Sequence, residues 1–135
     1  MPFEFSNKTI DEKLIEKVAE LSGQDLGKCM QCGTCSASCP MNVYAAATPR
    51  HIMHLIQFGQ SEALDHLNTY WLCASCHTCE VRCPRGLDIP KVMEALRQIK
   101  LRQNVDHVEP SNLQPEEIVE LPQIAMVSGF RKFTS

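Results

Sequence analysis

The sequence has few aromatic residues, no long apolar stretch and no surplus of basic residues, and each of these shortages excludes a class of protein. Aromatic residues make up 6% of the 135 residues, so any core must be largely aliphatic. No stretch approaches the roughly 20 apolar residues of a membrane span, and residues 1–7 are acidic and aromatic where a signal peptide is basic and then apolar. The net charge of −3 is unsuited to binding nucleic acid. We therefore expect a small cytoplasmic protein with neither a membrane span nor a nucleic-acid partner.

Motifs of common catalytic sites are missing as well. The chain contains no nucleophile with a paired base, no glycine-rich phosphate loop and no flavin or nicotinamide motif. We therefore predict no catalytic residues in this chain itself.

What the sequence has instead is cysteine, arranged as one motif that occurs twice. Both runs read C-x2-C-x2-C-x3-C-P, and their eight cysteines are Cys29, Cys32, Cys35, Cys39 and Cys73, Cys76, Cys79, Cys83. Because cytosolic thiols are normally kept reduced, eight cysteines in such a chain indicate metal or cluster binding. This spacing is that of bacterial ferredoxins, in which three close cysteines bind one [4Fe–4S] cluster and the fourth binds the other.

The spacing therefore predicts two [4Fe–4S] clusters that exchange their fourth ligands. Two intervening residues let the backbone curl so that amide N–H groups point at the cluster, and the proline after each fourth cysteine keeps that cysteine extended. The ligands expected for cluster 1 are Cys29, Cys32, Cys35 and Cys83, and those for cluster 2 are Cys73, Cys76, Cys79 and Cys39.

Zinc and disulfides are the alternative uses of these cysteines. Structural zinc sites typically draw their ligands as two separated pairs, whereas here four cysteines crowd into each run and both runs repeat the same spacing. A disulfide framework is typical of small secreted chains, which the composition does not indicate. Both alternatives are therefore weaker than the cluster prediction.

The histidines near the runs have simple interpretations. His77 lies between Cys76 and Cys79, where it could donate to a cluster sulfur, but facing solvent is the simpler interpretation, and four thiolates already complete a cluster. His51 and His54 could bind a metal only if further ligands converged on them, so a solvated helix face is the simpler interpretation there.

Three basic residues flank the cysteines, namely Lys28, Arg82 and Arg85. Positive charge near a cluster could raise its reduction potential or contact a partner. From the sequence alone, the simpler interpretation is that these three residues are ordinary surface charges.

Apolar residues at helical spacing predict helices on either side of the cysteine runs, and nothing between the runs alternates like a strand. We therefore expect an all-α fold. The predicted helix N-caps are Thr9 (in a capping box with Glu12), Thr48, Ser61 and Asp88. Two of these helices are expected to end at Gly23 and Gly59.

Residues 105–135 are predicted to form a tail distinct from the domain of residues 1–104. Pro110, Pro115 and Pro122 interrupt the chain there, and the segment 121–133 turns apolar and then basic. This segment is too short to form a core of its own. It either packs back on the domain or docks on a partner subunit.

The chain resembles a known family, the C subunits of heterodisulfide reductases. The likeness is carried by residues 28–40 (KCMQCGTCSASCP), the helical insert, residues 71–84 (WLCASCHTCEVRCP) and the helix that starts at Asp88. The resemblance implies an α-helical ferredoxin fold with both clusters between short helices. It also implies a soluble complex in which this chain relays single electrons from a flavin-containing A subunit to a catalytic B subunit that reduces a disulfide.

Two other kinds of electron carrier share such cysteine runs. A free ferredoxin would need a fully polar surface, and the apolar tail speaks against that. The iron–sulfur module of a succinate dehydrogenase, fumarate reductase or glycolate oxidase generally has a further cluster domain or a fused catalytic region, for which 135 residues leave no room.

Overall fold

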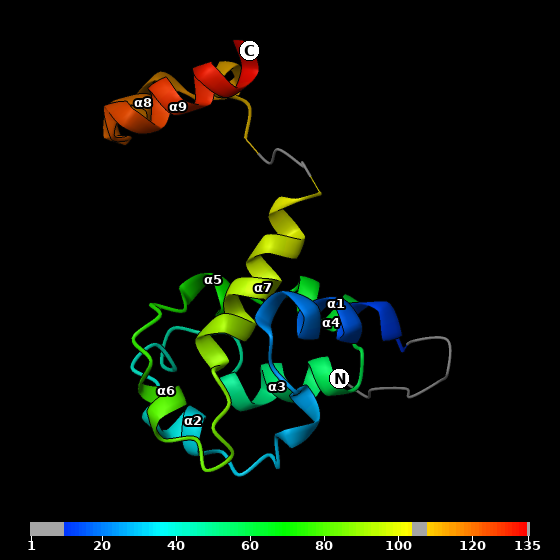
Figure 1. Ribbon diagram of the computed structural model, residues 1–135. Coiled ribbons are helices and arrows are strands. Elements are labelled where there is room, and N and C mark those ends of the chain that lie inside the picture. Colours follow the sequence, from blue (N-terminus) through cyan, green and yellow to red (C-terminus); the bar gives the residue numbers. More distant parts are fainter. Residues whose placement is uncertain (1–9, 104–107, 135) are drawn as a thin grey trace. The chain divides into compact units, whose positions relative to one another are not determined.

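The fold is entirely helical in the part of the chain that the computed structural model describes, residues 10–103 and 108–134 (Figure 1). No β-strand occurs within these ranges, which confirms the predicted all-α fold class. The chain divides into unit 1, which ends at Arg102, and unit 2, which begins at Gln103. Within the described ranges no helix has the length and apolar character needed to cross a membrane.

Unit 1 arranges short helices around the two cysteine runs (Figure 1). Helix α1 packs on α7, α5 also packs on α7, and the short helices α2 and α6 lie against each other. The helices α2 and α6 each contain the third cysteine of a run, so their contact brings the two runs together. The elements are α1 (Glu12–Ser22), η1 (Leu26–Lys28), α2 (Thr34–Ser38), α3 (Pro49–Gln57), α4 (Ser61–Asp65), α5 (Thr69–Leu72), α6 (Thr78–Val81) and α7 (Ile89–Leu101).

Two of the predicted N-caps are confirmed. The backbone N–H of His51 donates to Thr48 Oγ1 at 3.3 Å, and Pro49 follows as the first residue of α3. The backbone N–H of Lys91 donates to Asp88 Oδ1 at 3.1 Å at the start of α7. Each bond satisfies an N–H that has no partner within the helix, which typically stabilises the protein by about 1 kcal/mol.

The other two caps differ from the prediction. Thr9 lies outside the described residues, and the N-cap of α1 is Asp11, whose carboxylate accepts from Leu14 N at 3.2 Å. Ser61 is the first residue inside α4 and not its cap, because Gln60 already supplies the backbone carbonyl that accepts from Leu64 N at 3.2 Å.

Gly23 and Gly59 follow α1 and α3, as predicted, and both have positive φ angles. At Gly59 the chain also passes close to the start of α1, where Asp11 N donates to the carbonyl oxygen of Gly59 at 2.9 Å. A Cβ on Gly59 would lie 2.8 Å from Asp11 N, a distance that no side chain tolerates. The glycine thus joins the end of α3 to the start of α1.

The core of unit 1 is aliphatic, as the composition predicts. It lies between α1, α3 and α7, and its most deeply buried side chains are Val18, Ile52, Met53, Ile56, Leu87, Val92 and Met93. Each fully buried side chain of this kind contributes roughly 1.5–3 kcal/mol through the hydrophobic effect. The core therefore fixes the helices from which the cysteine loops extend.

Unit 2 contains helices that the sequence analysis did not predict, namely η2 (Pro110–Asn112), α8 (Pro115–Glu120) and α9 (Gln123–Thr134). Pro115 and Pro122 had been interpreted as chain breakers. In the structure Pro115 is the first residue of α8 and Pro122 directly precedes α9. Proline is well suited to these positions, because the first N–H groups of a helix have no intrahelical acceptor.

Candidate metal centre

The cysteines of the two runs line two separate cavities in unit 1. Cavity 1 is lined by Cys29, Cys32, Cys35 and Cys83, and cavity 2 by Cys39, Cys73, Cys76 and Cys79. Each cavity thus takes three thiols from one run and the fourth thiol from the other run. These are the two sets that the spacing predicts, and their role as ligands stays a prediction.

The contact of α2 with α6 makes this exchange possible. Cys39 directly follows α2 in an extended conformation, with φ −76° and ψ 118°, and precedes Pro40. The chain therefore leaves α2 toward the second cysteine loop instead of folding back on its own. Ile89, the first residue of α7, lines both cavities and so lies between them.

The backbone of the two cysteine loops repeats the same conformation 44 positions apart. Gln31 and Gly33 have φ angles of 57° and 83°, and their counterparts Ser75 and His77 have φ angles of 51° and 59°. Left-handed residues within a loop turn successive N–H groups toward a concave surface that favours anions. Each left-handed residue other than glycine costs about 1–2 kcal/mol, so this shape is maintained against local strain. Both loops are therefore shaped to surround a negatively charged group.

A threonine hydroxyl lies beside one cysteine in each loop. Thr34 Oγ1 is 3.4 Å from Cys32 Sγ, and Thr78 Oγ1 is 3.4 Å from Cys76 Sγ. These hydrogen bonds lower the pKa of Cys32 and Cys76, because they stabilise the thiolate. Cys32 and Cys76, the exposed second cysteines of the two runs, therefore ionise more readily than ordinary thiols, and the thiolate is the form that binds metals.

The third cysteine of each run has a raised pKa instead of a lowered one. Burial raises the pKa of Cys35, and burial together with the neighbouring Cys73 raises the pKa of Cys79 to about 11. Such a thiol keeps its proton at neutral pH unless a metal ion takes the place of the proton. Four converging thiols fit an iron–sulfur core, which is cationic by itself and becomes a net anion once four thiolates bind it.

These pKa shifts predict unequal reactivity of Cys76 and Cys79 in the metal-free chain. At pH 8 Cys79, with a pKa of about 11, is almost entirely protonated, whereas the pKa of Cys76 is lowered and a larger fraction of its thiol is ionised. We expect iodoacetamide to modify Cys76 markedly faster than Cys79, as measured by mass spectrometry of peptides. Equal rates for the two would contradict the environments described here.

One side chain from the following helix supports each loop, and sequence reasoning missed both. Gln57 of α3 donates to the carbonyl oxygens of Leu26 and Cys29 at 2.9 and 3.1 Å. Arg97 of α7 donates to the equivalent carbonyl oxygens of Tyr70 and Cys73, at 2.8 and 3.2 Å. Gln57 and Arg97 thus bond equivalent carbonyl oxygens of the two loops, although the Gln57 side chain is neutral and the Arg97 side chain is charged. No local sequence signal could have identified them, because each bond joins residues more than 20 positions apart.

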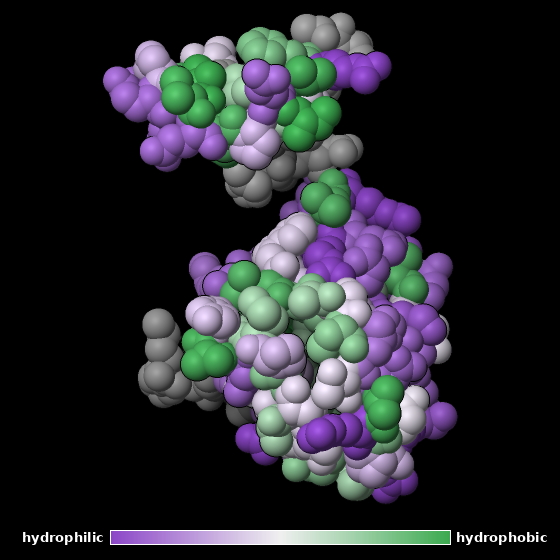
Figure 2. All heavy atoms as spheres, turned by 90° about the vertical axis from the view of Figure 1, so that its left-hand side faces the viewer, coloured by the Kyte–Doolittle hydropathy of each residue, from purple (hydrophilic) through white to green (hydrophobic). Residues whose placement is uncertain are grey.

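The surroundings of the two cavities differ in charge and polarity. Arg50 and Arg85 line cavity 1, whereas the described residues that line cavity 2 carry no charged side chain apart from the thiols themselves. Large exposed apolar side chains occur in the segments next to the cavity 2 cysteines, namely Val43, Tyr44 and Trp71. Figure 2 shows that the face of unit 1 carrying α5 and α6 is largely neutral or weakly apolar, with hydrophilic residues along its border.

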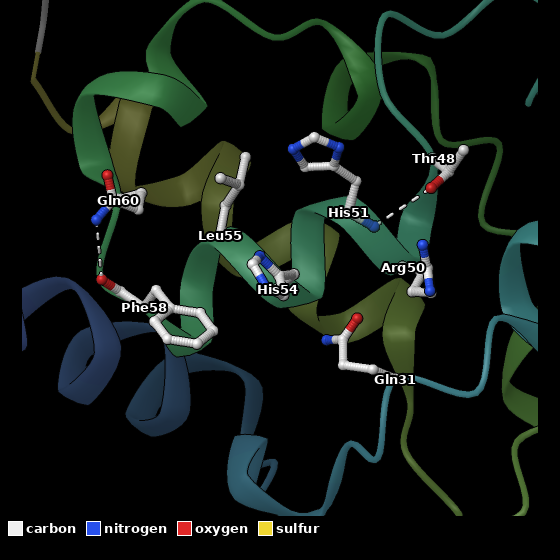
Figure 3. A pocket seen from close by; sticks show the side chains of 8 residues that line it. All are labelled: Gln31, Thr48, Arg50, His51, His54, Leu55, Phe58 and Gln60. Atoms are coloured by element: carbon white, nitrogen blue, oxygen red, sulfur yellow. Dashed lines mark hydrogen bonds between the residues drawn. The ribbon is translucent and has the colours of Figure 1, made fainter. Parts of the chain in front are cut away.

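The histidines do not join the cysteines. His77 Nδ1 lies 2.6 Å from Glu80 Oε2, so this side chain pairs with a carboxylate. His51 and His54 line a separate pocket on α3 together with Arg50, Gln31 and Phe58 (Figure 3). Among the described residues no third metal-ligating side chain joins these two histidines.

Comparison with known proteins gives a consistent result. A family model described as a 4Fe–4S dicluster domain matches residues 28–88. The C subunit of the ferredoxin:CoB-CoM heterodisulfide reductase of Methanosarcina mazei is 33% identical over 110 residues, which cover 82% of this chain and 66% of the relative. The iron-sulfur C 2 subunit of the CoB–CoM heterodisulfide reductase of Methanocaldococcus jannaschii is 35% identical over 97 residues, covering 69% and 52% of the two chains. The chain thus spans between about half and two thirds of the length of these relatives.

Proposed function

Because the chain belongs to the family of heterodisulfide reductase C subunits, with an α-helical ferredoxin fold and two [4Fe–4S] clusters, we propose that it is the electron-relay subunit of a heterodisulfide reductase-like complex. In this role it receives single electrons from a flavin-containing A-like subunit. It passes them to a catalytic B-like subunit that reduces a disulfide, and it performs no bond cleavage of its own.

The observation that carries this proposal is the pair of adjacent four-thiol cavities. We propose Cys29, Cys32, Cys35 and Cys83 as the ligands of cluster 1, in cavity 1, and Cys73, Cys76, Cys79 and Cys39 as the ligands of cluster 2, in cavity 2. The bound clusters supply reversible one-electron chemistry. The residues of the chain hold the clusters with Ile89 between them, direct backbone N–H groups at them through left-handed loop residues, and place a threonine hydroxyl 3.4 Å from one ligand sulfur of each cluster.

Two measurements on the chain from its native host test the proposal. Anaerobically isolated protein should contain about eight iron and eight sulfide per chain, since each cubane has four of each. Gentle affinity purification should recover a flavoprotein and a further reductase subunit with it. Recovery of a lone monomer without these subunits would favour a free ferredoxin, and a colourless zinc protein would exclude the relay altogether.

We further propose that unit 2 docks the chain to one of these subunits. Its helix α8 carries Glu116, Glu117 and Glu120, and its helix α9 exposes Ile124 and Val127, at 72% and 51% of their surface. Ile118 and Leu121 of the preceding segment line a hollow together with Val127. An exposed apolar surface of this kind, bordered by charged residues, is typical of a protein interface.

The double substitution Ile124→Glu and Val127→Glu is expected to reduce the recovery of partner subunits at least about tenfold, because it places two charges where apolar contact would be buried. Iron content should stay at the wild-type level, since α9 belongs to a unit without cysteines. Gln123→Glu on the same helix is the matched control. Unchanged recovery with the double variant would contradict docking through α9.

A further inference from the structure

The two cysteine cavities allow a comparison within one molecule, because their cysteine loops share the same backbone conformation and the same threonine contact. Cys32 and Cys76 are both exposed, and each is 3.4 Å from a threonine hydroxyl. The left-handed residues occupy equivalent positions in the two loops. The threonine contacts and the solvent exposure of the second cysteine are therefore similar in both, and the first loop has one further hydrogen bond to sulfur, from Gln31 Nε2 to Cys29 Sγ at 3.6 Å.

Charge is what differs, and cavity 1 has two arginines that are not neutralised. The Arg50 side chain extends along the first loop, where a Cβ on Gly33 would lie 3.6 Å from Arg50 Cδ. Its backbone N–H donates to Ser36 Oγ at 3.0 Å, which joins the start of α3 to α2. Arg85 lines the same cavity two residues after Cys83. Neither arginine forms an ion pair with any described residue of the chain.

Figure 3 shows Arg50 together with Gln31 of the first cysteine loop at the edge of the α3 pocket. Both residues also line cavity 1. The surrounding sequence adds no compensating charge, because residues 26–61 contain no aspartate or glutamate. Arg50 is thus unopposed by any carboxylate of its own segment.

Several charged groups near cavity 2 are paired, although Arg82, at the end of α6, has no ion pair among the described residues. Arg97, which donates to the carbonyl oxygen of Cys73, is bound by Glu94, with Nη2 and Oε2 2.7 Å apart. His77 is bound by Glu80. Asp88 and Lys91, at the start of α7, form a further ion pair, with Lys91 Nζ 3.0 Å from Asp88 Oδ2. The Arg97–Glu94 and Lys91–Asp88 pairs contribute little net charge, and no positively charged side chain lines the second cavity among the described residues.

We infer that Arg50 and Arg85 make the cluster in cavity 1 the acceptor of higher reduction potential, so that a single electron on this chain resides on cluster 1. This inference rests on the proposed function, because it assigns an order to the two clusters of the relay. In the internal transfer the cluster in cavity 2 goes from the 1+ to the 2+ state and the cluster in cavity 1 from the 2+ to the 1+ state. No proton or co-reactant takes part.

The size of the effect follows from electrostatics. A unit charge about 10 Å from a cluster, in surroundings with an effective dielectric constant of about 20, changes the equilibrium for adding an electron roughly tenfold. Salt weakens such an interaction at exposed positions, and Arg50 and Arg85 are both exposed. The preference for cluster 1 should therefore decrease as ionic strength rises.

Electron paramagnetic resonance of the reconstituted full chain, poised at a series of potentials with dithionite and mediators, tests the inference. Cys32→Ser and Cys76→Ser, at equivalent positions of the two loops, alter the signal of one cluster each and so identify it. We expect the first signal to change in Cys32→Ser and not in Cys76→Ser. In the double variant Arg50→Gln and Arg85→Gln the first reduction step should move to lower potential, corresponding to a shift in the internal equilibrium of tenfold or more.

Arg102→Gln is the control for each arginine, because it removes one positive charge at the far end of α7 (Figure 1). If the arginine double variant does not hold both clusters, the salt dependence of the two steps in the unmodified chain decides the question. A first signal that belongs to cavity 2, or a shift no larger than that of Arg102→Gln, would overturn the inference and leave the relay function intact. Absence of two reducible clusters would instead overturn the proposed function.

Discussion

Replacing Cys83 with alanine is expected to remove the cluster held by the first cysteine run and to leave the other cluster in place. Cys83 belongs to the second run in the sequence, but it lines cavity 1 with Cys29, Cys32 and Cys35. Alanine offers no ligand, so iron should fall from about eight to about four per chain. Cys39→Ala should remove the other cluster, because Cys39 lines cavity 2.

Alkylation followed by peptide mass spectrometry identifies which cluster is lost. In Cys83→Ala we expect Cys29, Cys32 and Cys35 to become modified while Cys73, Cys76 and Cys79 stay protected, and Cys39→Ala should give the reverse pattern. Cys83→Ala and Cys39→Ala therefore serve as controls for each other. Modification of the second run in Cys83→Ala would mean that each run holds its own cluster, contrary to the exchanged arrangement.

The second large effect concerns the side chains that support the loops. Arg97→Met keeps the length and apolar contacts of the side chain but removes its bonds to the carbonyl oxygens of Tyr70 and Cys73. Leaving two partly buried acceptors without donors should lower the free energy of unfolding by about 2–4 kcal/mol. In a domain of this size we expect the melting temperature to fall by roughly 10 °C, measured by circular dichroism on the cluster-loaded chain.

Which cysteine run becomes accessible to alkylation shows whether a side chain supports one loop or stabilises the whole domain. Arg97→Met should expose the cysteines of the second run to alkylation first, because Arg97 donates to the second cysteine loop and not to the first. Gln57→Met should expose the first run instead, since Gln57 contacts Leu26 and Cys29. Arg102→Met, an exposed position just after the same helix as Arg97, should change neither pattern. Loss of both clusters at equal rates in each variant would contradict separate supports.

The parts of the fold that the sequence predicted are those determined by neighbours in the chain. Thr48 and Asp88 were identified as caps because a cap acts on an N–H three residues away. The cysteine sets followed from spacing within each run. In unit 2 the same local reasoning failed, because Pro115 and Pro122 interrupt helices in mid-sequence but suit helix starts, and the pattern does not distinguish the two.

What the sequence could not predict depends on contacts between distant segments. Arg97 reaches a loop 24 positions earlier, and Gln57 reaches one 28 positions earlier. The left-handed conformations of Gln31 and Ser75 had no sequence signal either, since both are residues that usually avoid positive φ. Arg50 was not considered as a neighbour of the first run, because only the packing of α3 on α2 brings it there.

Part of the hydrophobic core lies away from the cysteine cavities, and this bears on what oxygen would damage. Val18, Ile52 and Ile56 are fully buried and line neither cavity. We therefore expect oxidative destruction of a cluster to release the strained loop residues first, while the part of the core between α1 and α3 keeps its packing. A chain damaged in this way would need a new inorganic cofactor and not a new polypeptide.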